Sequence, residues 1–447
     1  MKNKIYLIGL ASALALTSCT NESALNKSHQ LASKTVNLKE LTKNTKTNKE
    51  ASEKLALFAE KMALNPGGFI FADEVFDQAL EQDSTNTRAL FYKGILAPLM
   101  AQKGILKRIN PWLKQQKPEE QEKHQQSIDE IPQSDIKDFL LSGSEDIGTI
   151  TDIQNHIDVT RSALLSSRSA IVSIKRSTLE LHTIFYSGGT SKVITDCAPK
   201  KISQGVYELR TCPQQSSLEL NLTRPDFEVL ALFYSSIAVG TTWAYTSYNL
   251  EDLTRISKAL ELETPKNGVI DYQKALSILR SEPQFLKIRN PEALKSIVSL
   301  GAEGMEAVRY ALKHQPELCR KGKPDQQNRP GFLFPEGFCT NAEASHSIMT
   351  LNAILEGPFQ IAKTQTNSKG EETDNRYVTE INVGNFLNNP PQDLRDLLPT
   401  EYDEQAHQIK FADETLGGLF PNADASTFFK FPIDGSSVSI QPAKALK

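Results

Sequence analysis

The chain has no strong excess of charge of either sign. Its 50 lysines and arginines oppose 54 aspartates and glutamates, which leaves a formal net charge of −4 over 447 residues. No basic field is therefore available to attract phosphates, and the balance argues against a nucleic-acid partner. The length allows two or three domains of roughly 150 residues, or one extended helical body.

The motifs of common catalytic and metal sites are also missing. The sequence has no GxSxG, GxxxxGK[ST], GxGxxG or HExxH. Its seven histidines are scattered, so His156, His182 and His346 are interpreted singly, as core-edge or surface residues. Ser134 and Lys137 form an SxxK pattern without a KTG, which is more typical of a helix N-cap than of a nucleophile. We therefore predict no catalytic residue, no metal and no cofactor.

The chain does have a short apolar run at its start. Lys2 and Lys4 precede the run Ile5–Leu16, and two small residues then precede Cys19. The run is shorter than the roughly 20 residues that span a bilayer. The pattern resembles a bacterial lipoprotein signal, which implies cleavage of residues 1–18 and attachment of acyl chains such as palmitate to Cys19. An ordinary secretory signal or a retained membrane helix is the alternative.

The lipoprotein resemblance also implies a location. Two or more acyl chains give stable membrane anchoring. In such lipoproteins an aspartate after the cysteine tends to retain the protein in the inner membrane, and this chain has Thr20 there. We therefore expect an outer-membrane lipoprotein that faces the periplasm. Residues 19–50, with few apolar side chains, are predicted to be the lipidated cysteine and a flexible tether, or alternatively a segment that orders on a partner.

Four further cysteines suggest disulfides, because an exported chain meets an oxidising compartment. Three pairings are possible. The loops between neighbouring cysteines favour Cys197–Cys212 and Cys319–Cys339. A metal site or reactive thiol is the alternative, but no CxxC is present.

Residues 51–176 are predicted to be mainly helical. Apolar residues recur at helical spacing over 51–64 and 69–82, and Leu90 and Gly94 lie on a further helix. Over roughly residues 51–100 this spacing resembles the tetratricopeptide repeat (TPR), which implies paired helices. Lys93 stands where that repeat has an apolar residue, and Pro98 interrupts the next helix, so no regular array is expected.

A polar stretch, 107–148, interrupts this region and is predicted to be a solvated insertion with a loop or short exposed helices. A long helix then starts at Thr151, where Thr151 and Gln154 form a capping-box pattern. Alternating residues over 177–224 predict a small antiparallel sheet pinned by Cys197–Cys212.

Residues 225–318 are predicted to form a central helical region. The stretch Val229–Asn249 has no charged residue, and a buried core helix explains it better than a membrane span because it contains several serines and threonines. Further helices are expected over Tyr272–Leu279 and Pro291–Leu312, the latter with an apolar stripe.

Residues 319–447 are predicted to be an irregular segment with one β-hairpin, formed by Phe359–Gln365 and Arg376–Val383. The segments 391–399 and 412–421 resemble parts of uncharacterised helical-repeat lipoproteins of predatory and related Gram-negative bacteria. In physical terms, Gly417 and Gly418 are expected to make a turn, and Leu419, Phe420 and Phe428 are expected to dock the tail on the helices. A recognition strip is the alternative.

The predicted fold is thus mainly α, with irregular TPR-like helical hairpins and small β-hairpin elements. The predicted role is a lipid-anchored, non-catalytic binding or scaffold module for an envelope protein or a small ligand. One alternative is an envelope hydrolase acting on cell wall or glycan, with carboxylates distant in sequence. Another is a structural envelope component without a small-molecule site.

Overall fold

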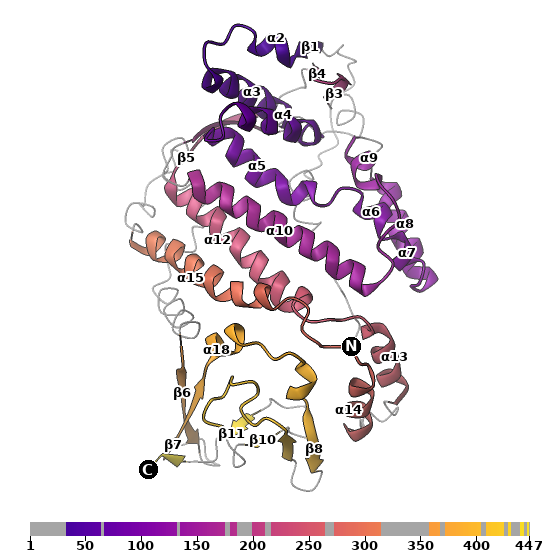
Figure 1. The fold of residues 1–447 in the computed structure, drawn as a ribbon, viewed down its shortest axis with the longest axis vertical. Coiled ribbons are helices and arrows are strands. Elements are labelled where there is room, and N and C mark those ends of the chain that lie inside the picture. The colour runs from indigo at the N-terminus through magenta and orange to yellow at the C-terminus, as the bar shows by residue number, and fades with distance from the viewer. Residues whose placement is uncertain are drawn as a thin grey trace. The chain divides into compact units, whose positions relative to one another are not determined.

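The structure is a computed structural model of the 447-residue chain. It describes residues 33–63, 67–131, 135–174, 179–185, 199–210, 216–263, 272–313, 357–366, 372–403, 408–423, 428–430, 439–441 and 445–446. These residues form a mainly α-helical protein with small β elements, as predicted (Figure 1). The chain divides into two compact units: residues 1–147, 166–231 and 316–334 make unit 1, and residues 148–165, 232–315 and 335–447 make unit 2.

Three helices of unit 1 form the helical hairpins that were predicted in the region 51–176. They are α3 (Asn48–Ala63), α4 (Phe69–Gln82) and α5 (Thr87–Met100). α4 packs against both α3 and α5. Ala56, Ala59, Ala72 and Ala79 are fully buried, and their small side chains allow the backbones to approach closely. The Ser52 hydroxyl strengthens the contact by donating to the Ala79 carbonyl at 2.7 Å.

Lys93, in the position where the tetratricopeptide pattern has an apolar residue, meets two carboxylates. Its Nζ lies 2.7 Å from Asp73 Oδ1 and 2.9 Å from Asp77 Oδ1. Burial alone would lower the pKa of Lys93, but the hydrogen bonds to these carboxylates outweigh burial and raise that pKa. The lysine therefore stays charged and links α5 to α4. Pro98 lies in the last turn of α5.

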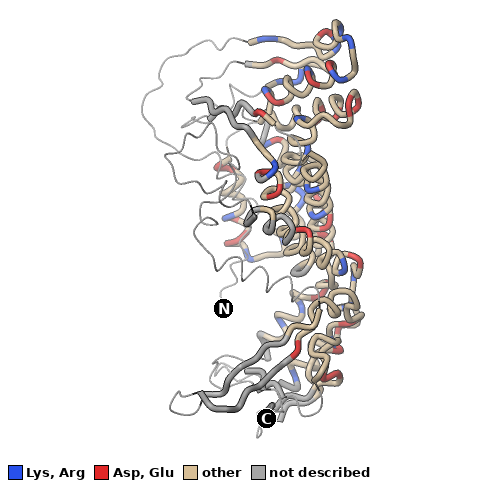
Figure 2. Tube along the Cα trace, turned by 90° about the vertical axis from the view of Figure 1, so that its left-hand side faces the viewer, with Lys and Arg blue, Asp and Glu red and all other residues tan. Residues whose placement is uncertain are grey.

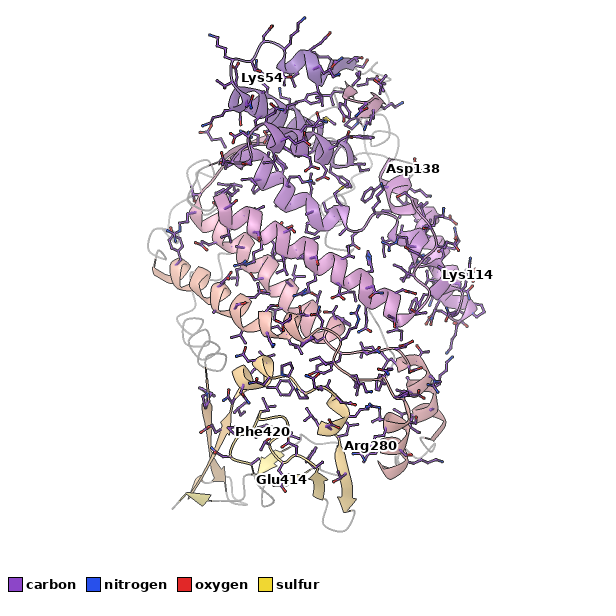
Figure 3. The ribbon with its side chains drawn as sticks, in the orientation of Figure 1. Lys54, Lys114, Asp138, Arg280, Glu414 and Phe420 are labelled. Carbon is purple, nitrogen blue, oxygen red and sulfur yellow. The ribbon has the colours of Figure 1, made fainter. Side chains whose placement is uncertain are left out.

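The polar insertion of unit 1 consists of short helices, one of the two forms that were predicted. They are α6 (Ile105–Arg108), α7 (Asn110–Leu113), α8 (Pro118–Glu130) and α9 (Asp135–Leu141). Lys114 and Asp138 mark this region in Figure 3. Gly104, which precedes α6, has a φ of 74° and donates its N–H to the Phe139 carbonyl at 2.9 Å. Ile128, Phe139 and Leu140 are buried, so the insertion has apolar anchors of its own.

Unit 1 has two small antiparallel sheets where one disulfide-pinned sheet was predicted. β2 (Leu179–Phe185) pairs with β5 (Ser216–Leu222). β4 (Val206–Arg210) lies between β1 (Ser33–Asn37) and β3 (Lys200–Ser203). The predicted strand at 206–209 therefore pairs with the N-terminal part of the chain, and not with β2 or β5.

β1 and the following helix α2 (Leu38–Thr42) belong to the segment 19–50 that was predicted to be a tether. Val36 of β1 pairs with Tyr207 of β4, and Tyr207 is fully buried against Phe58 and Phe71. The structure thus corrects the tether prediction for residues 33–50, which form β1, α2 and the first turn of α3. Residues 20–32 lie outside the described part of the chain.

Helix α10 (Ile150–Ile174) begins in unit 2 and ends in unit 1. Its capping box is formed by Thr149 and Asp152, and the predicted pair Thr151 and Gln154 is wrong. Asp152 Oδ2 accepts from the Thr149 N–H at 2.9 Å, and Thr149 Oγ1 accepts from the Asp152 N–H at 3.1 Å. The box therefore starts two residues earlier, which leaves Gln154 free for other contacts.

The apolar helix that was predicted over Val229–Asn249 is α12 (Arg224–Thr241), which continues into a π-helical turn, η2 (Thr242–Thr246). Phe233 is 56% exposed and Tyr245 is 52% exposed, so the core-helix prediction is correct for only part of its surface. Among the described residues, no helix has the length and apolarity that crossing a membrane requires.

Of the other described helices of unit 2, the first two pack against each other, and the remaining three share an apolar cluster. They are α13 (Leu253–Glu263), α14 (Tyr272–Ser281), α15 (Pro291–Lys313), α18 (Val383–Asn388) and the 3₁₀ turn η5 (Leu394–Leu397). Leu294 and Ile297 of α15 meet Phe386 and Leu387 of α18. α14 and α15 lie where helices were predicted.

Two further sheets complete unit 2. β7 (Glu372–Ile381) pairs with β6 (Phe359–Thr366), which confirms the predicted hairpin, and with β12 (Ala445–Leu446). The second sheet has the order β11 (Ser439–Gln441), β10 (Phe428–Lys430), β9 (Gln408–Phe411) and β8 (Pro399–Asp403). Arg280 of α14, labelled in Figure 3, donates to the Pro399 carbonyl at 2.9 Å.

The predicted glycine turn is present, and it has left-handed backbone geometry at three successive residues. The φ angles are 49° at Leu416, 71° at Gly417 and 77° at Gly418. Asp413 stabilises the turn, because its Oδ2 accepts from the Gly417 N–H at 2.6 Å. Leu419 packs against the apolar cluster of α15 and α18, as predicted.

Replacing Asp413 with alanine should lower the free energy of unfolding by about 1–2 kcal/mol at pH 7. Burial alone would raise the pKa of Asp413, but hydrogen bonds from Thr415 and Gly417 outweigh burial and lower it. Since the ordinary pKa is about 3.9, the stabilisation is complete above about pH 4 and is lost as pH falls through the lower, folded-state pKa. Urea denaturation between pH 7 and pH 2 measures this. Glu414→Ala is the control, and an equal, pH-independent loss in both variants would contradict the prediction.

Candidate functional site

The predicted lipidation and disulfide residues cannot be placed, because they lie outside the residues that the structure describes. They are Cys19, Cys197, Cys212, Cys319 and Cys339. Lipidation of Cys19 and both cysteine pairings therefore stay predictions. His346 also lies outside this part, whereas His156 is on α10 and His182 is on β2.

The buried carboxylates are engaged by structural partners. They are Glu60, Asp226, Glu228 and Glu282. Each accepts hydrogen bonds from an arginine or, for Asp226, from the Thr223 N–H at 2.9 Å. Within the described ranges, no group of three or more His, Cys, Asp or Glu residues could hold a metal ion. These contacts explain the four carboxylates by structure alone and do not favour the hydrolase alternative.

A polar cluster in unit 2 has features that these carboxylates lack. We call it the arginine centre and define it as Asn155, Asp158, Arg161, Thr242, Thr246, Arg289 and Ser296. Its residues come from α10, η2, α15 and the segment that precedes α15. The arginine centre thus joins parts of the chain that are far apart in the sequence.

Helix α10 contributes one polar face. Gln154, Asp158 and Arg161 follow each other at spacings of four and three residues, which places them on the same side of a helix. Arg161 donates from Nε to Thr242 Oγ1 at 2.7 Å and from Nη2 to Ser296 Oγ at 3.3 Å. Both acceptors are neutral hydroxyl groups.

Arg289 faces the same carboxylate from the other side. Its Nη1 lies 2.7 Å from Asp158 Oδ2, and its guanidinium also donates to Asn155 Oδ1 and to the Thr246 carbonyl. Asp158 is thus the acidic partner of Arg289 and also the charged neighbour of Arg161.

The π-helical turn η2 shapes the centre. The Ser247 hydroxyl donates to the Thr242 carbonyl at 2.6 Å. Gln154 donates from Nε2 to the Tyr248 carbonyl at 2.8 Å, and its Oε1 accepts from the Leu250 N–H at 3.1 Å. The buried side chain of Gln154 therefore satisfies backbone groups at the end of the helix. Short π-helical turns are frequent at functional sites.

The electrostatics of the centre favour an anion. The carboxylate of Asp158 pairs with Arg289 and acts on Arg161 only through its charge, so the seven residues carry two positive charges and one negative, a net charge of +1. Burial lowers the pKa of Arg161, and nearby Asp158 opposes that effect only in part. A charged acceptor stabilises a partly desolvated guanidinium more than neutral hydroxyl groups do, because charge-assisted hydrogen bonds are stronger.

Two polar atoms of the centre have unused bonding capacity. Thr246 is fully buried, and its Oγ1 has no hydrogen-bond partner among the described residues; the same is true of buried Asp158 Oδ1. An unpaired buried hydroxyl costs about 1–3 kcal/mol, which a ligand that accepts from Thr246 would recover. Asn155, a member of the arginine centre, is exposed, so the arginine centre reaches the surface.

Sequence reasoning missed this site. Gln154 was interpreted as a capping residue, and neither Arg161 nor Arg289 was singled out. One signal was available, because Gln154, Asp158 and Arg161 recur at helical spacing on α10. A polar face that is expected to pack beside an apolar helix indicates a buried polar site better than a solvated surface. Thr242 and Thr246 gave no signal of their own, because threonine is common in helices that are partly buried.

The fold and the arginine centre define the class broadly, as a mainly α-helical protein of two units with a basic polar site. No known family model, curated protein or solved structure matches this chain.

Proposed function

We propose that this chain is a lipid-anchored, non-catalytic binding module of the bacterial envelope, and that its arginine centre holds an anionic group of a small ligand or a protein partner. The anchor is the acylated Cys19 that the N-terminal signal implies. It holds the protein on the periplasmic side of the outer membrane. The observation that carries the binding role is Arg161, a partly buried guanidinium whose hydrogen-bond partners, among the described residues, are two hydroxyl groups.

The chemistry of the centre suits a carboxylate or a phosphate. Both groups accept charge-assisted hydrogen bonds from guanidinium, and both also accept from a threonine hydroxyl such as that of Thr246. Catalysis is not part of this proposal, because the centre pairs its carboxylate with Arg289 and has no activated nucleophile.

Replacing Arg161 with methionine should weaken anion binding by about 10- to 100-fold, the usual loss for a hydrogen bond to a charged group. Trp112 and Trp243 are the two tryptophans of the chain, and Trp243 lies within η2. A Trp112→Phe background therefore leaves one tryptophan, on the same turn of the chain as Thr242 and Thr246. Citrate and inorganic phosphate are titrated at constant ionic strength, and Trp243 fluorescence and the unfolding midpoint are followed.

The matched control is Arg168→Met. Arg168 is also on α10 and its pKa is also lowered by burial, but it is not a member of the arginine centre. A saturable response that persists in Arg168→Met and is lost in Arg161→Met supports the proposal. The absence of saturable binding in the parent protein, or equal binding in both variants, would refute it.

A further inference from the structure

The described part of the chain begins close, in sequence, to the predicted lipid anchor. Only residues 20–32 separate Cys19 from Ser33, the first residue of β1. Fully extended, a segment of this length reaches at most about 45 Å. The end of unit 1 that contains β1 and α2 is therefore kept near any membrane that holds the acyl chains.

That end of unit 1 is rich in lysine. We define the lysine tip as Lys34, Lys39, Lys43, Lys46 and Lys200, which come from β1, α2, the loop after α2, and β3. All five residues are exposed. Figure 2 shows the blue segments at this end of the unit.

The lysines of the tip differ from their neighbours in having no ion pair among the described residues. Lys201 lies 2.6 Å from Glu74, and Lys54 lies 3.3 Å from Glu50. Two acidic residues lie close to the tip: Glu40 is on α2, and Glu208 of β4 is the cross-strand neighbour of Lys200. The tip thus presents a local excess of unpaired positive charge, although the whole chain is slightly acidic.

We propose that the lysine tip docks on the anionic lipid headgroups of the membrane in which Cys19 is anchored. This inference rests on the proposed lipid anchor. Lysine is a compact, strongly hydrated charge, which suits a diffuse anionic surface better than a specific pocket. Attraction to such a surface acts within a Debye length, about 8 Å at physiological salt. The short linker keeps the tip at high effective concentration near the headgroups, so weak attraction per lysine is sufficient.

The test uses the mature lipidated protein, reconstituted in vesicles of phosphatidylcholine alone or with 30% phosphatidylglycerol as a roughly typical anionic fraction. A water-soluble amine-reactive ester modifies exposed lysines, and mass spectrometry gives the rate at each position. In anionic vesicles the rates at Lys39 and Lys43 should fall about tenfold relative to neutral vesicles, and high salt should restore them. Lys123 on α8 is exposed and has no ion pair with any residue that the structure describes, so it is the internal control and its rate should not change.

Charge reversal sharpens the test. The variant Lys39→Glu with Lys43→Glu should remove the protection of the remaining tip lysines, because each lysine lost weakens docking about fivefold. Flotation of the vesicles separates the two proposals. Protein that does not float refutes the anchor, and the docking with it. Protein that floats in both vesicle types with equal reactivity at the tip refutes the docking alone.

Discussion

Glu60→Ala should destabilise unit 1 by about 3–5 kcal/mol, the range seen when one partner of a buried ion pair is removed. Glu60 on α3 is 3% exposed. It accepts from Arg88, and from the Tyr92 hydroxyl at 3.0 Å. Burial and then the charge of Glu60 raise the pKa of Tyr92, so the phenol stays neutral and donates. Without Glu60, the largely buried guanidinium of Arg88 keeps only its contact with the exposed Glu53 among the described residues, and the buried Tyr92 hydroxyl loses its acceptor.

Glu53→Ala is the matched control for this prediction. Glu53 is on the same helix and also contacts Arg88, at 3.3 Å, but its side chain is 48% exposed. Its removal should cost less than about 1 kcal/mol. Urea denaturation followed by far-ultraviolet circular dichroism measures both. An equal loss of unfolding free energy in the two variants would contradict the prediction. It would show that the burial of Glu60 does not make its contacts with Arg88 and Tyr92 stronger than the contact of Glu53 with Arg88.

Gly104→Ala should cost about 3 kcal/mol, because two penalties add. The residue has a φ of 74°, a conformation that costs an alanine roughly 1–2 kcal/mol. In addition, a Cβ atom would lie 2.0 Å from the Ser142 carbonyl oxygen, so the backbone must move, and such overpacking costs about 1–3 kcal/mol. The loss would appear as a lower urea midpoint.

Gly205→Ala separates the two penalties. Gly205 has a φ of 70° and open space where the Cβ would lie, so only the conformational penalty of about 1 kcal/mol remains. If Gly104→Ala lowers the free energy of unfolding no more than Gly205→Ala does, the prediction is wrong. The backbone at Ser142 would then move away from the new Cβ atom at little cost.

The helices could be predicted where local signals mark both ends. α4 runs over the predicted residues 69–82, because glycines precede it and Asp83 and Ser84 follow it. α15 begins at Pro291, a residue that suits the first helical position. The β6–β7 hairpin was predictable for the same reason, since its strands are neighbours in the sequence.

Elements that depend on distant partners could not be predicted. Residues 33–37 are too polar to suggest a strand, and they form one because β4 supplies the hydrogen bonds. The arginine centre has the same origin, since Arg161 finds its hydroxyl partners 81 and 135 residues further along the chain. The local sequence predicts neither the pairing of β1 with β4 nor the contacts of Arg161, because no residue involved is unusual in its own segment.

The pairing of β1 with β4 has a consequence for biosynthesis. β1 must wait for about 170 further residues to emerge before its partner exists, which at typical translation speeds takes roughly 10–30 s. Throughout that interval β1 has unpaired backbone groups that another chain could capture. A lysine on such a strand disfavours pairing with another chain. We therefore expect Lys34 to reduce aggregation of the newly made chain.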